Sequence, residues 1–197
     1  MKIAITADLH LRTRSEKPER FTALEDILRQ MMDKGINDLI IAGDLFDSSC
    51  DNPGEFEKVL FDPKYKDIHV YMIPGNHDPK ISQRMFAHEH IHIFSEPAIH
   101  QFSHDLRIVF IPYTQDKTYG EILGSLEINE DNSPWILIGH GDYTTNLRVN
   151  EYERGSYMPI CRKDIDLFRP KQVFLGHIHQ SGMFERIGFY PGSPCPI

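Results

Sequence analysis

Residues 38–47 read DLIIAGDLFD, a short apolar segment that runs into a glycine and two aspartates. An apolar run of this length that ends at a glycine predicts a buried strand over 38–42. Similar apolar segments occupy 2–7 (KIAITA) and 68–73 (IHVYMI), and polar residues follow each of them. The first half of the chain therefore contains three predicted strands that end in polar clusters.

The segments around these strands decide the fold class. Apolar residues recur three and four positions apart over 19–34, before Gly35, which predicts an amphipathic helix; 55–60 is predicted as a shorter one. Later in the chain short apolar runs dominate, at 91–94, 98–102, 106–111, 135–139, 172–176 and 182–190, with weak helical stretches near 117–127 and 162–168. This pattern predicts an α/β fold with more antiparallel pairing in the second half.

Length and composition indicate one domain over residues 1–197, with no repeat or linker. Apolar residues make up 40% and charged residues 25%, and no apolar run approaches the roughly 20 residues that span a membrane. The first ten residues do not resemble an export signal, and Cys50, Cys161 and Cys195 form no CxxC pair, so we expect a cytoplasmic protein with reduced thiols. The net charge of −8 argues against broad electrostatic binding to nucleic acid or membranes.

Polar side chains follow five predicted strands at the point where each strand ends. They are Asp8 and His10; Asp44 and Asp47; Asn76, His77 and Asp78; His140; and His177 and His179. Ligand-binding groups of open α/β sheets gather at the carboxyl ends of strands. Any one of these clusters is better explained as a turn cap or a surface histidine, but all five together favour a metal centre.

The types of candidate ligand narrow the choice of metal. Imidazole nitrogens, carboxylates and one amide carbonyl suit Mn²⁺ first, with Fe²⁺ or Zn²⁺ as alternatives. The candidates number seven: Asp8, His10, Asp44, Asn76, His140, His177 and His179. They are too many for one tetrahedral site and suit two ions that share a carboxylate, which predicts a two-metal hydrolase.

The motifs D-x-H, G-D-x-x-D, G-N-H-D, G-H and G-H-x-H together resemble those of the calcineurin-like metallophosphoesterases, over most of the chain. The resemblance implies a four-layer α-β-β-α sandwich with two mixed sheets. We expect residues 1–197 to form the catalytic domain alone, without a capping domain. The stretches GDLFD, FIPY at 110–113, FLGHIHQ at 174–180 and YPGSP at 190–194 are most similar to SbcD-type DNA repair exonucleases.

Carried over by position, the resemblance implies two ligand sets that share Asp44. The first set is Asp8, His10, Asp44 and His179, and the second is Asp44, Asn76, His140 and His177. A hydroxide between the two ions would be the nucleophile that attacks phosphorus.

Five further residues are expected to assist. His77 would protonate or stabilise the leaving alkoxide, and Asp78 would fix its tautomer. Asp47 would orient a ligand histidine. Arg12 and Arg14, in a locally basic loop, could hold substrate phosphates, although a solvated loop explains them equally well.

The alternating tract His88, His90 and His92 also resembles a metal-binding sequence, but its apolar neighbours predict a strand edge facing solvent.

The expected activity is metal-dependent hydrolysis of phosphodiester bonds in DNA, as an exonuclease or endonuclease. The alternative is a small substrate, such as a cyclic nucleotide or a phosphomonoester. A catalytically silent scaffold would lack ligands, and none is missing. Two divalent cations would offset half of the net negative charge and place positive potential where phosphate binds.

The resemblance also implies a homodimer and an SMC-like ATPase partner. The nucleases of this type continue past the position of Ile197 into DNA-capping and ATPase-binding regions. We therefore expect the ATPase partner only if the native chain continues beyond this residue.

Overall fold

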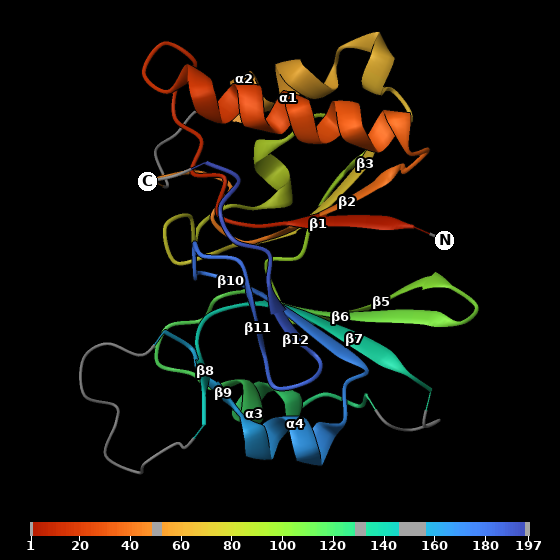
Figure 1. Cartoon of the computed structure of the whole chain (residues 1–197), viewed down its shortest axis with the longest axis vertical. Coiled ribbons are helices and arrows are strands. Elements are labelled where there is room, and N and C mark those ends of the chain that lie inside the picture. The colour runs from red at the N-terminus through yellow and green to blue at the C-terminus, as the bar shows by residue number, and fades with distance from the viewer. Residues whose placement is uncertain (1, 49–52, 129–132, 146–156, 196–197) are drawn as a thin grey trace.

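The computed structural model describes residues 2–48, 53–128, 133–145 and 157–195. Two β-sheets face each other in the middle of the molecule, and helices cover both outer faces (Figure 1). The arrangement has the four layers, α-β-β-α, that the resemblance implied.

The first sheet has the strand order β1-β2-β3-β4, and all of its pairs are parallel. Its strands are β1 (Ile3–Thr6), β2 (Asp38–Ala42), β3 (His69–Ile73) and β4 (Ile91–Ile93). The prediction that both sheets are mixed is therefore wrong for this one. The physical reason is that every connection between its strands is a crossover, so each strand starts from the same end of the sheet.

The crossovers contain the helices that cover this sheet. They are α1 (Pro18–Asp33), α2 (Pro53–Leu60), and the short helices η1 (Pro63–Tyr65) and η2 (Gln83–Met85). The helix predicted over 19–34 is displaced by one residue at each end, because Pro18 occupies its first turn and Lys34 is its C-cap.

The second sheet is mixed, with the order β11-β12-β10-β7-β6-β5. Its strands are β5 (Ala98–Ser103), β6 (Leu106–Ile111), β7 (Trp135–His140), β10 (Gln172–Gly176), β11 (Gly182–Phe184) and β12 (Gly188–Tyr190). The expected antiparallel pairing occurs in the hairpins β5–β6 and β11–β12, whereas the three central pairs are parallel. Two helices, α3 (Tyr119–Leu123) and α4 (Arg162–Phe168), cover its outer face, and β8 (Tyr143–Thr144) pairs with β9 (Ile160–Cys161) nearby.

Alternation along the strands divides the buried side chains among three apolar layers. On β2, Leu39 and Ile41 pack with α1, whereas Ile40 and Ala42 face the second sheet. On β7, Leu137 belongs to the layer under α3 and α4. Fully burying an aliphatic side chain contributes roughly 1.5–3 kcal/mol, so these layers supply most of the stability. No helix within the described ranges is long and apolar enough to cross a membrane.

Candidate metal centre

The polar clusters meet where the carboxyl ends of the two sheets approach each other. Nδ1 of His140, at the end of β7, lies 3.0 Å from the carbonyl oxygen of Ala42, at the end of β2. Gly176, at the end of β10, lies so close to Ala42 that a Cβ would collide with the same carbonyl. These contacts require glycine at positions 43 and 176, where a Cβ would collide with His140. They bring together side chains from both sheets.

Four of the candidate ligands have a backbone conformation that side chains rarely adopt. Asp8, His10, Asp44 and His177 have positive φ angles of 55°, 46°, 50° and 94°. A non-glycine residue held in this region costs about 1–3 kcal/mol. Hydrogen bonds compensate, since Asp8 N donates to Gly43 O at 3.1 Å and His10 N to Asp44 O at 3.0 Å. The strained turns redirect these side chains into one space.

Asp44 lies at the centre of this space. Its Oδ1 accepts a hydrogen bond of 2.9 Å from the backbone amide of His77. Its Oδ2 is buried and has no hydrogen-bond partner within the described ranges. That oxygen lies 3.4 Å from Nε2 of His140 and 3.7 Å from Nε2 of His10. A buried carboxylate oxygen without a hydrogen bond is costly unless a cation binds it.

On one side of Asp44, ligand atoms of the first predicted set converge. The Nε2 atoms of His10 and His179 are 3.1 Å apart, and Nε2 of His179 is 3.9 Å from Oδ1 of Asp8. Asp8, His10 and His179 therefore form one of the groups that could hold a metal ion.

On the other side, ligand atoms of the second predicted set face one another. Oδ1 of Asn76 lies 2.8 Å from Nε2 of His140 and 3.0 Å from Nδ1 of His177. In the neutral form of His140, which is the form that binds a cation, Nδ1 donates to Ala42 O and Nε2 presents a lone pair toward the lone pairs of Asn76. Facing lone pairs and the unpartnered Asp44 oxygen fit two divalent cations that share Asp44.

The titration of the buried groups agrees with a site built for positive charge. Burial raises the pKa of Asp8 to about 6 and lowers the pKa of His10 to about 4. Burial alone would lower the pKa of His140, but the carboxylate of Asp44 raises it to about 9. Burial would also raise the pKa of Asp44, yet His140 holds that pKa below its usual value. Without a metal, a proton on His140 balances Asp44, so protons and cations compete here.

His77 lies at the open side of the centre, with 44% of its side chain exposed. Its ring meets the ring of His10 edge-on, with 4.7 Å between centroids. Nδ1 of His77 lies 3.0 Å from the backbone carbonyl of Asp47, which makes Nδ1 the donor and leaves Nε2 free to face solvent.

The prediction that Asp78 fixes the tautomer of His77 is therefore wrong. Asp78 is buried, and its two carboxylate oxygens accept hydrogen bonds from the amides of Gly75 (2.7 Å) and Phe46 (3.1 Å). Asp78 thus fastens the loop after β3 to the loop after β2. Asp47 has one carboxylate oxygen 3.4 Å from Nδ1 of His10, and its role in orienting that ring stays a prediction.

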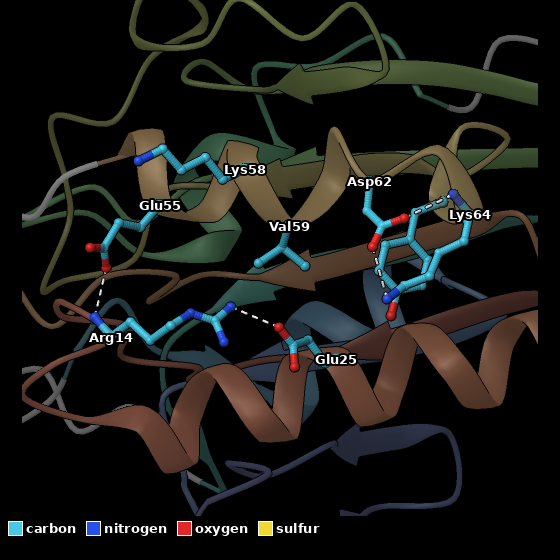
Figure 2. Close-up of a pocket in the computed structure, with 8 residues that line it drawn as sticks. Arg14, Glu25, Glu55, Lys58, Val59, Asp62 and Lys64 are labelled. Carbon is cyan, nitrogen blue, oxygen red and sulfur yellow. Dashed lines mark hydrogen bonds and ion pairs between the residues drawn. The ribbon is translucent and has the colours of Figure 1, made fainter.

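The two arginines of the basic loop lie in different surroundings. Arg12 forms an ion pair with Asp47 at 2.5 Å, beside His10. Arg14 points into a groove between α1 and α2, where its guanidinium binds Glu25 at 2.7 Å (Figure 2). The same guanidinium lies over the ring of Phe21. The carboxylate of Glu25 offsets the charge of Arg14 in this groove, and the roles of Arg12 and Arg14 in holding substrate phosphates stay predictions.

Two residues at the site, Asp142 and Ser193, were not identified from the sequence. Asp142 Oδ1 lies 3.6 Å from Nε2 of His177, and its Oδ2 accepts a hydrogen bond of 2.8 Å from the amide of Tyr157. Ser193 donates from Oγ to the carbonyl of Asp8 at 2.8 Å. Asp142 follows the G-H motif of His140 by two residues and Ser193 lies inside YPGSP, so a signal was present, but only the fold shows which ligands they contact.

Comparisons with known proteins concern the sequence family and the fold. A sequence profile described as calcineurin-like phosphoesterase matches residues 1–195. The fold is similar to the crystal structure of TT1561 of Thermus thermophilus, with a TM-score of 0.61, 14% identity, and coverage of 98% of this chain and 89% of that chain. A second solved structure has a TM-score of 0.57 at 10% identity, and the match covers 96% of this chain and 89% of that chain.

Replacing Asp8 by asparagine should separate stability from cation binding. Because the carboxyl pKa rises from 3.8 to about 6 on folding, the cation-free protein loses stability as pH rises through that interval. In EDTA at pH 7, Asp8→Asn should therefore raise the free energy of unfolding by about 1–3 kcal/mol. Mn²⁺ should raise the Tm of the wild type and raise that of the variant much less. Urea and thermal unfolding measure both, and a destabilised variant in EDTA would contradict this interpretation.

Asp142 should act through His177. Asp142→Ala should weaken cation binding about 10–100-fold, as removal of such a partner of a ligand histidine does. Asp142→Asn keeps one oxygen, which can accept from Nε2 of His177, and it should recover most of the affinity. Calorimetric titration with Mn²⁺ measures the difference. Equal affinity in the alanine variant and the wild type would show that Asp142 only fastens the loop.

Proposed function

The chain belongs to the calcineurin-like phosphoesterase family, and we propose that it hydrolyses phosphodiester bonds of DNA with two divalent cations. The observation that carries the proposal is the buried, unpartnered Oδ2 of Asp44, with imidazole nitrogens of His10 and His140 on either side of it. A carboxylate in this position is suited to bridge two cations.

We assign the ligands as the motifs order them. Asp8, His10 and His179 would share one cation with Asp44, and Asn76, His140 and His177 would share the other. When bound, the cations bind phosphate oxygens and lower the pKa of a water so that it can attack phosphorus. The protein orients the ligands in advance, because the Ala42 carbonyl holds His140 and the backbone amide of His177 donates to Asp8 at 2.9 Å.

His77 is the proposed proton donor. The Asp47 carbonyl holds Nδ1, so Nε2 of the protonated ring can give its proton to the departing oxygen of the substrate. The exposed ring of His77 adjoins the ring of His10, which supports a role for His77 at the substrate's phosphate; His77 also belongs, with His10 and Asp44, to a group of side chains suited to a metal ion.

Two features favour DNA over a small phosphoester. His77 and His179 are both exposed at the site, which suits a long substrate. The stretches that resemble SbcD-type nucleases also lie at the site: Tyr113 of FIPY has its ring 6.4 Å from the ring of His140, and Ser193 of YPGSP binds the Asp8 carbonyl.

Removing the imidazole of His77 should slow the chemical step and leave cation binding intact. We expect His77→Ala to lower kcat on bis-(p-nitrophenyl) phosphate by about 10²–10⁴-fold, the usual contribution of a general acid. The matched control is His104→Ala, because the side chain of His104 is 99% exposed and belongs to the β5–β6 connection. If His77→Ala binds Mn²⁺ normally and turns over at the wild-type rate, His77 is not the proton donor.

The choice of substrate is tested with labelled single- and double-stranded DNA and with cyclic nucleotides, all in Mn²⁺. We expect kcat/KM to be highest for DNA, and Asp44→Asn to abolish cleavage of every substrate because it removes the bridging charge. Cleavage of cyclic nucleotides or phosphomonoesters without cleavage of DNA would favour a small-substrate phosphoesterase. No cleavage of any substrate by the Mn²⁺-loaded wild type would contradict the enzymatic proposal.

A further inference from the structure

A second group of histidines lies at the amino ends of β3 and β4, at the end of these strands away from the metal centre. His69 and Tyr71 of β3 stack with His90 and with His92 of β4. The ring centroids of His69 and His90 are 4.1 Å apart, and those of Tyr71 and His92 are 4.8 Å apart. With His100 and Phe102 of β5, these side chains form what we call the ring row.

The ring row joins the two sheets. Tyr71 of the first sheet lies 4.6 Å from Phe102 and 5.6 Å from His100 of the second, measured between ring centroids. Next to them, Phe94, which follows β4, stacks on Phe110 of β6 at 4.1 Å. Tyr71, Phe94 and Phe102 pack against the apolar layer between the sheets. The row therefore closes the edge of that layer between β4 and β5.

The sequence prediction for the tract His88, His90 and His92 is corrected by these contacts. His90 and His92 do not face solvent freely but are half-buried in the row. Stacked rings direct their nitrogen lone pairs along parallel planes, so the nitrogens do not converge on one point. Among the residues the structure describes, groups of three or more side chains suited to a metal ion occur only at the centre around Asp44.

A positive charge on His69, His92 or His100 is unfavourable within the ring row. Burial lowers the pKa of His69, His92 and His100, and the neighbouring histidines lower it further for His69 and His92. Acidic groups oppose this on one flank only, where Asp38, Asp67 and Glu89 attract a proton to His69. Glu89 also lies 3.8 Å from His90, and the ring of His88 is 5.5 Å from that of His90. The pKa values of His69, His92 and His100 are all lowered, because the effect of burial is larger than the attraction of the acidic groups.

We propose that the ring row is an acid-sensitive clamp between the two sheets. Neutral rings hold β3 and β4 against β5, whereas protonated imidazoles repel one another at these separations and release the edge strands. The clamp belongs to the fold and does not depend on the proposed activity.

The direction of the pH dependence follows from linkage. A histidine whose pKa is lower in the closed form than in the open form stabilises the closed form above its open-form pKa. That stability is lost as pH falls from about 6.5, the value of a free histidine, toward the lower pKa. Opening therefore becomes more favourable with acid, by up to about tenfold for each histidine and pH unit in this interval.

Hydrogen exchange of the full chain in EDTA, corrected for the intrinsic rate at each pH, tests the clamp. The key variant replaces His69, His92 and His100 by phenylalanine, which keeps the rings and removes the charges. His104→Phe is the matched control, because His104 is fully exposed outside the row. Between pH 7 and 5, amides of β3, β4 and β5 should lose protection by about tenfold or more in the wild type and the control, by the same linkage.

The triple variant should keep its protection over this interval. An equal loss of protection in the triple variant and in the wild type would overturn the proposal. So would a wild type in which the protection of the β3, β4 and β5 amides does not change between pH 7 and 5. If the triple variant does not fold, His92→Phe alone carries the test. It should show a smaller loss than the wild type, and an unchanged loss would equally overturn the clamp.

Discussion

The contact between the His140 imidazole and the Ala42 carbonyl is the interaction on which the candidate metal centre depends. It joins the carboxyl ends of β7 and β2, one strand from each sheet. Asp8, His10, Asp44 and Asn76 come from the first sheet, and His140, His177 and His179 from the second. Neither sheet alone holds a complete set for either cation. A Cβ at Gly43 or Gly176 would meet His140, so glycine at these two positions allows the sheets to approach.

Much of the fold and of the centre follows from short-range patterns in the sequence. Strand ends are visible as an apolar run, a glycine and a polar residue, and the amphipathic period of α1 fixes its bounds to within a residue. The partners of a side chain are not visible in this way. Asp78 follows His77 in sequence, yet it binds amides of Gly75 and Phe46 because the chain folds back there. Likewise His90 and His92 become half-buried because their rings stack on His69 and Tyr71 of the neighbouring strand β3.

The centre is maintained against local free-energy costs. Positive φ angles at four candidate ligands and an unpartnered carboxylate oxygen both oppose folding. The three apolar layers offset these costs, and they lie directly beneath the strained turns. Arrangements of this kind are typical of functional sites, where preorganised ligands are obtained at the expense of stability.

The hydrogen bond from Ser193 to the Asp8 carbonyl spans 185 residues of sequence. Ser193 also donates from its backbone amide to the His179 carbonyl at 2.9 Å, so the same segment supports ligands from both ends of the chain. During synthesis at about 5–20 residues per second, Asp8 and His10 would wait about 10–40 s before this support could form. The centre therefore matures only after Ser193 has been synthesised, and the nascent chain carries its first ligands long before it can hold a cation firmly.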